Sequence, residues 1–512
     1  MANEKGRAKP PYLLQPSDTM LIVQKNMAEG CEMNITVSYE IGKSQIENFE
    51  GLVSEVFYSV LEIGRSLVRE ALEQADKVLM ESRDRERYRC KGFQKTCIKT
   101  KLGAVEYKRR VYVDNAAAEK QHCVHLLDEA LDIKKVGLVS SGICQLAAEA
   151  VCTSTYRGAA RMISEATGLD ISAQGVWDIV QQLGQSQEAA VERHTELAEA
   201  HQGVGKIETK ILYEENDGIW LKLQGQSRKE NGSSKEMKVG IAYDGATWEE
   251  GKNGNKRRTL DNKVAYASFE GVKDFRRKKE GLLASRFDVD AIDLRVLNGD
   301  GASWIQKQKG TNTIAVLDEF HRNKKITECV RNKDFAETLK KLLYKKEIDK
   351  LLDCIEAQIN SVSDKDEIAG LRELQRYYTE NKDALLGYYD RGIPIPETRA
   401  PGVVHHARLG SMESNIYTLI GNRMKDGRAC WSIRGANHLA LLLCLRHTTG
   451  FDYLFAKLPE KPEITQETEW KDTLPIFGAS KVPEREGNGY EYPINFTTSK
   501  AGNWLTNWLR KL

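Results

Sequence analysis

The fold prediction starts from residues 293–305, which read DLRVLNGDGASWI. Leu294, Val296 and Leu297 form a short apolar run, which predicts a buried strand. The run ends in Asn298-Gly299-Asp300-Gly301, so we expect the Asp300 carboxylate at the edge of a sheet, between two residues without side chains. Such a carboxylate suits Mg²⁺, which binds one or two carboxylates and keeps room for water and phosphate. The alternative is an ordinary Gly-Asp-Gly turn, because turns commonly have this composition.

Neighbouring segments extend this strand into a sheet. Strand-like patterns occupy residues 210–214, 219–223, 237–243, 264–269 and 313–317, and a basic helix is predicted between Asp274 and Phe287. The first two patterns flank Glu215-Asn216-Asp217-Gly218, which places Asp217 beside the opening strand. Three antiparallel strands, a helix and two further strands that alternate with helices describe a mixed α/β sheet. In a sheet of that order the first and fourth strands are neighbours, so Asp217 and Asp300 are expected at one edge.

Composition limits the classes of protein to which the chain can belong. Its 512 residues are 40% hydrophobic and 29% charged, which is ordinary for a protein of several folded units. The net charge is +2, so any affinity for nucleic acid must come from local patches. No apolar run approaches the roughly 20 residues that span a bilayer, and we expect no membrane partner. The cysteines lack CxxC pairs, which fits a reducing cytosol. Cys90, Cys97, Cys123 and His125 are spaced too widely for a usual zinc site, so free thiols are expected instead of zinc.

The first 200 residues predict four regions. Residues 1–43 are a loosely ordered leader, and residues 44–88 repeat apolar side chains at helical spacing, which predicts a long amphipathic helical region for packing or self-association. Residues 89–135 are a basic region in which strands around Leu102-Gly103-Ala104 predict a hairpin. A solvated edge and a phosphate-facing surface are about equally good readings of this hairpin. Its candidate DNA contacts are Lys99, Lys101, Arg109 and Arg110.

Residues 136–200 predict a helix-turn-helix. A helix over Tyr156–Thr167 is followed by Gly168, which can adopt the left-handed turn that ends a helix. Ser172 is then a good N-cap for a second helix over Ala173–Leu183. From these residues alone an ordinary helical hairpin is favoured over a DNA-binding helix-turn-helix. The side chains expected to face DNA are Arg157, Arg161, Gln174, Asp178 and Gln181.

The rest of the chain divides into a core interrupted by helices. We expect residues 205–321 to form the first part of this core, residues 322–400 a charged helical insertion, residues 401–456 the last part of the core, and residues 457–512 a tail. Helical character resumes from Met412 to Leu445, and Glu413 lies near its start. Three convergent carboxylates from Asp217, Asp300 and Glu413 would repel one another unless cations held them together. Two Mg²⁺ ions roughly 3.5–4 Å apart could then clamp a phosphodiester.

An ordered set of segments resembles a known family. They are ESRDRERY (81–88), IKTKLGAVEYKRRVY (98–112), LLDEALDI (126–133), STYRGAARMISEATGLDISAQGVW (154–177), ENDGIWLKLQ (215–224), LNGDGASWI (297–305), LDEFHRNKK (317–325) and GSMESNIYTLIGNRMKDGRACWSIRGANHLA (410–440). Together they resemble the ISLre-type bacterial insertion-sequence transposases, and through them the Mutator-like DDE transposases with a ribonuclease H-like catalytic core. The resemblance runs from about Glu47 to Leu445, and it leaves the leader and the tail unassigned.

The resemblance implies roles for particular residues. Asp217 and Asp300 would be the catalytic aspartates and Glu413 the closing glutamate, all three holding metal. Asp318 and His321 would form an Asp-x-x-His element, in which His321 orients a phosphate or a water on the metal, or makes a structural hydrogen bond. Two roles are open for the Trp431 ring, packing behind the glutamate helix or stacking on a flipped base. Further phosphate contacts are expected from Arg423, Lys425 and Arg434.

The function implied is DNA transposition by metal-assisted phosphoryl transfer. Water would cut the element end, and the 3′-hydroxyl released would attack target DNA, with two Mg²⁺ ions, or Mn²⁺ as a substitute, as cofactors. The expected partners are double-stranded DNA, both element ends and target, and a second copy of the chain in a homodimer or higher oligomer. The expected location is the bacterial cytoplasm, at the nucleoid. Two alternatives stay open: a silenced or domesticated DNA-binding protein, and a nuclease of the same sheet class that cuts without joining.

Overall fold

The computed structural model describes residues 22–27, 33–38, 48–117, 122–202, 205–250, 256–306, 312–396, 409–427, 429–458 and 460. The chain divides into two compact units, residues 1–143 with 161–171 and residues 144–160 with 172–512. Of the predicted leader, 1–43, only the antiparallel strands β1 (Ile22–Met27) and β2 (Met33–Ser38) belong to the described residues. The predicted tail, 457–512, lies almost wholly outside them.

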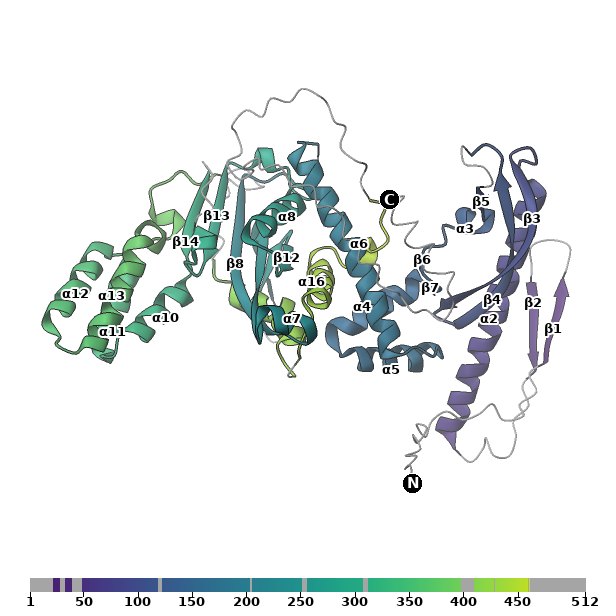
Figure 1. Cartoon of the computed structure of the whole chain (residues 1–512), viewed down its shortest axis with the longest axis horizontal. Coiled ribbons are helices and arrows are strands. Elements are labelled where there is room, and N and C mark those ends of the chain that lie inside the picture. Colours follow the sequence, from purple (N-terminus) through teal and green to yellow (C-terminus); the bar gives the residue numbers. More distant parts are fainter. Residues whose placement is uncertain are drawn as a thin grey trace. The chain divides into compact units, whose positions relative to one another are not determined.

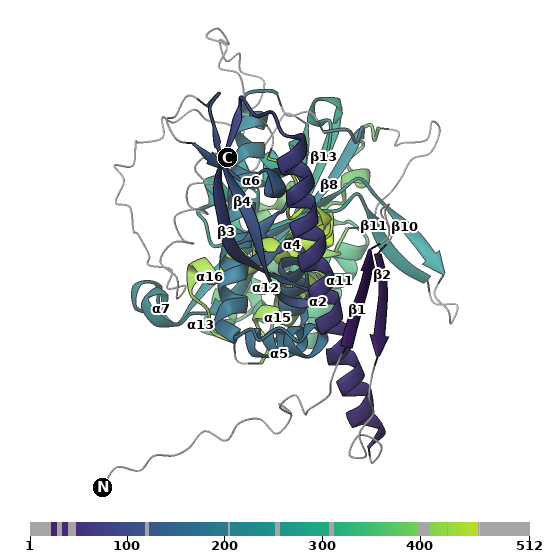
Figure 2. The same ribbon diagram turned by 90° about the vertical axis from the view of Figure 1, so that its right-hand side faces the viewer.

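The first unit is a long helix packed on a five-stranded sheet. Helix α2 (Phe49–Ser82) starts at the N-cap Asn48, whose side chain accepts a hydrogen bond from the Glu50 amide. The sheet order is β5-β4-β3-β7-β6, and its antiparallel centre is the predicted hairpin (Figures 1 and 2). Four half-buried apolar residues of α2 pack on its buried residues Ile98, Val105 and Tyr107. The elements are β3 (Tyr88–Thr100), β4 (Gly103–Asp114), β5 (Cys123–Val124), α3 (Leu126–Ala130), β6 (Lys135–Val136) and β7 (Val139–Ser140).

Three helices follow, α4 (Ser141–Thr153), α5 (Tyr156–Thr167) and α6 (Ala173–Glu199). The predicted turn is present, because Gly168 has φ +61° and the Ser172 hydroxyl accepts a 3.0 Å hydrogen bond from the Gly175 amide. The second helix was predicted to end at Leu183, and this is wrong. Gly184 does not end α6 but lets it pack closely: a Cβ there would lie 2.3 Å from the Cβ of His438.

The second unit is built on a mixed five-stranded sheet of order β12-β9-β8-β13-β14 (Figure 1). Its strands are β8 (Ile211–Lys222), β9 (Ser234–Tyr243), β12 (Val264–Ser268), β13 (Leu294–Gly299) and β14 (Thr313–Leu317). Strands β12, β9 and β8 pair antiparallel, and β8, β13 and β14 pair parallel. The first and fourth strands, β8 and β13, are neighbours, as predicted.

One detail of the predicted sheet is wrong. The patterns at 210–214 and 219–223 belong to a single strand, β8, which continues through Asp217 and Gly218. Those two residues pair with Val239 and Lys238 of β9, so the backbone stays in the ladder where the sequence indicated a break. The polar run resembles a turn in sequence, but the side chains of Glu215 and Asn216 are buried and bonded to distant parts of the chain.

Helices α6, α8 (Val272–Ala284) and α16 (Ile433–Thr448) pack with one another and with the antiparallel strands (Figure 1). A buried ionic network joins α8 to the sheet. Lys279 lies 2.6 Å from Glu214 of β8, and Arg295 of β13 contacts Glu280 at 2.5 and 2.8 Å and Glu214 at 3.4 Å. Shorter elements are α7 (Gly225–Asn231), β10 (Gly245–Glu250), β11 (Lys256–Asp261), η1 (Val289–Ala291), α9 (Ser303–Gln306) and η5 (Phe451–Tyr453).

The predicted helical insertion is present between β14 and the last part of the core. It comprises α10 (Glu319–Cys329), α11 (Lys333–Tyr344), α12 (Ile348–Ser361), α13 (Lys365–Glu380), η2 (Lys382–Leu385) and η3 (Tyr388–Asp390), and a shared apolar core holds the four α-helices together. Its bundle lies beside β14 (Figure 1).

Helical structure returns at Met412 but not as one helix through Leu445. It consists of α14 (Met412–Ile416), a π-helical turn η4 (Tyr417–Gly421) and α15 (Asn422–Met424), and the next helix, α16, begins at Ile433. Between them Trp431 forms an isolated bridge with Leu223 just past β8. Across the described ranges, no helix is both long enough and apolar enough to cross a membrane.

Candidate functional site

Asp217 and Asp300 lie at corresponding positions of two neighbouring parallel strands. Asn298 of β13 pairs with Glu215 of β8, and Gly299 with Asn216, so the next residues along the two strands are Asp300 and Asp217. Gly301 follows with φ +87°, a conformation that favours glycine. The adjacency that the strand order predicted for the two aspartates is therefore present.

The turn after β13 is held from two sides. The Asp300 carboxylate accepts a 2.8 Å hydrogen bond from the Ala302 amide, and the Asp300 carbonyl accepts a 2.7 Å hydrogen bond from the Tyr377 hydroxyl of α13. A Cβ at Gly301 would come within 2.9 Å of the Tyr377 ring, so only glycine allows this approach. The helical insertion thus helps to fix the turn that carries Asp300.

The electrostatics of Asp217 show which groups surround it. Its carboxylate accepts a 2.7 Å hydrogen bond from the Gly218 amide. Burial raises the pKa of Asp217, and the charges of Asp300 and Asp318 raise it further, while the Gly218 hydrogen bond and His321 act in the opposite direction. The four side chains Asp217, Asp300, Asp318 and His321 therefore form one electrostatic group at this edge of the sheet.

Asp318 and His321 are brought together as the Asp-x-x-His element requires. Asp318 caps α10 by accepting hydrogen bonds from the Phe320 and His321 amides, and His321 Nδ1 lies 3.3 Å from Asp318 Oδ1. Contact with Asp318 raises the pKa of His321 against the effect of burial, and Asp217 and Asp300 raise it further. Although burial acts to raise the pKa of Asp318, contacts with His321 and Asn298 hold it below its ordinary value.

Glu413 does not join this group. Its side chain is exposed on α14, and the described residues contain no set of three or more His, Cys, Asp or Glu side chains arranged to hold a metal ion. Convergence of Glu413 with the two aspartates is therefore not observed, and its role as a third ligand stays a prediction. The chain just before Glu413 is bound to a different buried carboxylate.

That carboxylate belongs to Glu215, which sequence reasoning passed over. Its side chain is 0% exposed and accepts hydrogen bonds from five donors. They are the Tyr243 hydroxyl (2.7 Å), Asn298 Nδ2 (3.0 Å) and the amides of Gly410 (3.0 Å), Ser411 (3.0 Å) and Met412 (3.2 Å). The only signal in the sequence was an acid on the same face of β8 as Asp217, two residues away.

Of the two roles predicted for Trp431, the structure supports packing. The ring is 7% exposed, and its Nε1 donates a 2.8 Å hydrogen bond to the Met424 carbonyl. Arg423 was predicted to contact phosphate, and this is wrong. Its guanidinium lies over the rings of Tyr156 and Trp431, donates to the Val151 carbonyl and has its pKa lowered by burial. Lys425 and Arg434 are exposed.

The residues of the helix-turn-helix that were predicted to face DNA divide into buried and exposed side chains. Gln181 was predicted to face DNA, and this is wrong, because it is 6% exposed and its Oε1 lies 2.8 Å from His438 Nδ1 of α16. Arg157, Arg161 and Gln174 are exposed, although Gln174 donates a 2.9 Å hydrogen bond to Asp178.

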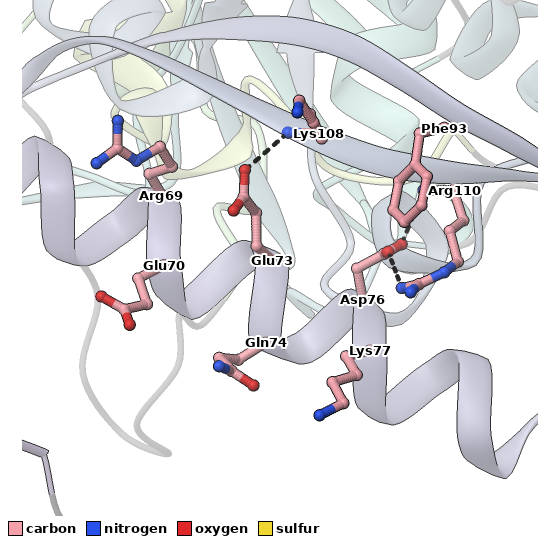
Figure 3. A pocket seen from close by; sticks show the side chains of 9 residues that line it. All are labelled: Arg69, Glu70, Glu73, Gln74, Asp76, Lys77, Phe93, Lys108 and Arg110. Atoms are coloured by element: carbon pink, nitrogen blue, oxygen red, sulfur yellow. Dashed lines mark hydrogen bonds and ion pairs between the residues drawn. The ribbon is translucent and has the colours of Figure 1, made fainter. Parts of the chain in front are cut away.

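The candidate DNA contacts in the basic hairpin also divide into engaged and exposed side chains. Arg109 is 7% exposed and ion-paired with Asp128, so its predicted DNA contact is wrong. Arg110 is paired with Asp76 at 2.6 Å and lies over the Phe93 ring, which engages its charge within the protein (Figure 3). Lys99 is half-buried, and Lys101 is exposed.

A groove of about 550 Å³ runs between α2 and β4, and it contains this ion pair (Figure 3). Glu73 and Asp76 of α2 accept hydrogen bonds from the Lys108 and Arg110 amides at 3.1 and 3.0 Å. Carboxylates thus occupy backbone donors that a further strand would otherwise use.

Comparison with known proteins gives one match. No curated protein matches the chain. The model of a family described as "Uncharacterised protein family (UPF0236)" matches residues 44–456, which is most of the chain. The match includes both aspartates, the Asp-x-x-His element, the insertion and Glu413. The chain therefore belongs to the UPF0236 family.

Proposed function

We propose that this protein is the DNA transposase of an insertion sequence, with a ribonuclease H-like core. The observation that carries the proposal is the placement of Asp217 and Asp300 on adjacent parallel strands, with Asp318 and His321 beside them. Three antiparallel strands followed by two parallel strands, in the order β12-β9-β8-β13-β14, are the arrangement that such a core requires. The helical insertion before Glu413 agrees with the same family resemblance.

The donor set fits a hard cation. Asp217 and Asp300 offer carboxylate oxygens, the ligands that Mg²⁺ and Mn²⁺ prefer. Burial and neighbouring acids disfavour the charged form of Asp217, a cost that a bound cation would remove. Asp217 and Asp300 would hold the ions, and Glu413 would complete the set. When bound, Mg²⁺ supplies charge neutralisation at the phosphate that is cut.

The side chains of the protein then have defined tasks. Contact with Asp318 favours the protonated form of His321, so its ring can donate a hydrogen bond to a phosphate oxygen. Gly299 and Gly301 let Ile305 and the Tyr377 ring pack closely against the turn that carries Asp300, which fixes the position of that carboxylate. Water attacks the phosphorus at the element end, the bond to the 3′-oxygen breaks, and a 3′-hydroxyl is released. That hydroxyl attacks a target phosphorus, and the target's own 3′-oxygen leaves.

Exposed cationic and polar residues are the proposed contacts to DNA. They are Lys101 in the hairpin, Arg157, Arg161 and Gln174 in the helix-turn-helix, and Lys425 and Arg434 after Glu413. Most contacts of this kind bind phosphate and set the register of the protein on the duplex, and few read bases. Two ends of an element must be held together, so we propose a homodimer as the smallest active form.

The test uses labelled element ends, Mg²⁺ and a target plasmid. Asp300→Asn removes one proposed ligand and is expected to reduce strand cleavage at least 1,000-fold, on the order of the loss of a main electrostatic contribution, with DNA binding within a fewfold of wild type. Asp293→Asn is the matched control, because Asp293 is an exposed acid of the same segment, 3.6 Å from Lys210. Equal loss of binding and cleavage in Asp300→Asn would contradict the assignment.

The exposed position of Glu413 favours a second candidate, a protein that binds DNA without completing the reaction. The same assay separates the possibilities. Joined products indicate a transposase, and a shifted band without cut strands indicates a binding protein. Cut strands without joining indicate a nuclease of the same sheet class.

A further inference from the structure

We infer that Glu215 is a positioning residue of this site: its buried carboxylate fixes the segment that carries Glu413 to the strand that carries Asp217. The inference rests on the proposed function, since it assigns Glu215 a task in the same reaction. It concerns the chain's own contacts, so it can be tested separately from DNA cleavage.

The contacts of Glu215 come from three distant parts of the chain. Tyr243 belongs to β9, Asn298 to β13, and Gly410, Ser411 and Met412 form the segment that leads into α14. The Gly410 bond joins residues 195 apart in sequence. Met412 directly precedes Glu413, so the anchor ends one residue from the proposed ligand. Two residues along β8 from Glu215, on the same face, lies Asp217.

Asn298 extends the anchor to the other half of the site. Its side-chain amide donates to Glu215 Oε2 at 3.0 Å and to Asp318 Oδ2 at 3.1 Å. Asp318 in turn contacts His321 and caps α10. Asn298 also lies two residues before Asp300. One connected set of hydrogen bonds therefore joins Glu215, Asn298 and Asp318. The other residues of the proposed site lie within three residues of a member of this set or of its donors.

The same contacts show why Glu215 positions other residues and does not itself bind a cation. A carboxylate has about four lone-pair directions, and five donors share those of Glu215. Its complete burial leaves no oxygen for a cation or for substrate. A charge buried at this depth is tolerated only while its donors stay in place, so the segment 410–412 is held firmly to β8.

Two further contacts hold the same segment from outside the anchor. Arg258 of β11 donates a 3.0 Å hydrogen bond to the Ser411 hydroxyl, and Lys263 donates a 3.2 Å hydrogen bond to the Asn415 side chain. Of the side chains that hold this segment, Glu215 is the fully buried carboxylate. Loss of that charge should therefore loosen α14 more than it loosens the sheet.

The experiment compares full-length wild type with Glu215→Gln. The glutamine keeps the shape of the side chain but turns a donor toward the backbone donors. Hydrogen–deuterium exchange is expected to accelerate at least tenfold in residues 409–424, with far smaller changes in β8 and β13. In the cleavage assay the Mg²⁺ concentration for half-maximal rate is expected to rise about tenfold, on the order of the effect of losing outer-shell support for a ligand, with DNA affinity within twofold.

The control is Leu351→Ala, which removes a buried side chain from the helical insertion. It lowers stability without touching the anchor, so it should leave the Mg²⁺ dependence unchanged. If Glu215→Gln alters exchange in 409–424 and the Mg²⁺ dependence no more than this control does, the inference is overturned.

Two more arms keep the outcomes distinct. If Glu215→Gln fails to fold, Asn298→Ser breaks the bridge to Asp318 while Glu215 keeps its charge, and it is expected to shift the Mg²⁺ dependence in the same direction. An unchanged dependence in that variant overturns the inference. If wild type does not cut DNA at all, the proposed function fails, and the exchange arm alone then decides whether Glu215 anchors α14.

Discussion

Substitution of Arg295 by methionine tests the buried ionic network behind the two strands that carry the aspartates. Arg295 has a side chain 9% exposed and contacts Glu280 and Glu214, whose side chains are 10% and 5% exposed. Removal of one partner of such a set leaves a carboxylate buried without compensation, which typically costs about 3–5 kcal/mol. We expect a loss of that size in the free energy of opening of β8 and β13 at pH 7.

The loss should depend on pH in a defined direction. Burial acts to raise the pKa of Glu214, but Lys279 and Arg295 outweigh it and hold the pKa below its ordinary value. A depressed carboxyl pKa contributes stability above the unfolded value of about 4.3, and this contribution disappears as pH falls through the folded value. Arg295→Met removes part of the depression, so its cost should be largest at neutral pH and smaller near pH 3.

Native-state hydrogen exchange at amides of β8 and β13 measures this cost, since each unit of the chain can open separately. The double variant Glu280→Gln/Arg295→Met is the control, because it also removes the orphaned charge and should recover part of the loss. A loss below about 1 kcal/mol, the size expected of an exposed ion pair, would refute the reasoning. So would a loss that is independent of pH.

The remaining predictions concern the expected DNA contacts and one histidine. Lys101→Ala should weaken binding of element ends and reduce the salt-dependence slope of the binding constant by about 1. Arg110→Ala should change neither, because the charge of Arg110 is already paired with Asp76. Fluorescence anisotropy across a salt series measures both slopes, and equal slopes for the two variants would contradict this prediction. Gln181→Leu leaves Nδ1 of the buried His438 ring without its partner and should cost about 1–3 kcal/mol, with DNA affinity unchanged. Weaker binding at unchanged stability would restore Gln181 as a contact. Burial and two nearby cations lower the pKa of His125 to about 4. As pH falls, the unfolded chain therefore takes up this proton before the folded chain does, and the stability of the first unit should fall between about pH 6.5 and pH 4. Urea unfolding at several pH values should show this pH dependence in wild type and a weaker one in His125→Gln.

Much of the fold could be predicted from local patterns. The hairpin around Leu102, the order of the sheet and the insertion all follow from alternation, helical spacing and turn residues. The pairing of β8 with β13 follows from strand order alone, and it brought Asp217 next to Asp300. These features need only short stretches of sequence and general rules of strand connection.

What could not be predicted depends on partners far away in sequence. Arg109 and Gln181 looked like surface residues because nothing nearby in the chain shows their contacts with Asp128 and His438. The helix predicted over Ala173–Leu183 was too short, because nothing nearby in the chain shows that Gly184 packs closely on His438. Glu215 was missed for the same reason, since four of its five donors lie beyond β9 or in the segment at 410–412.

The anchor at Glu215 has a consequence for the order in which the protein can be completed. Chains are synthesised from the N-terminus, and domains fold as their residues emerge. Strand β8 can pair with β9 early, but three of the five donors to the Glu215 carboxylate are residues 410–412. Until those residues have left the ribosome, only Tyr243 and Asn298 can donate to the carboxylate, and water must take the place of the other three donors. A message truncated before codon 410 would therefore yield a chain without the last connection of its proposed site, and such a fragment should be cleared by proteases before it can act on DNA.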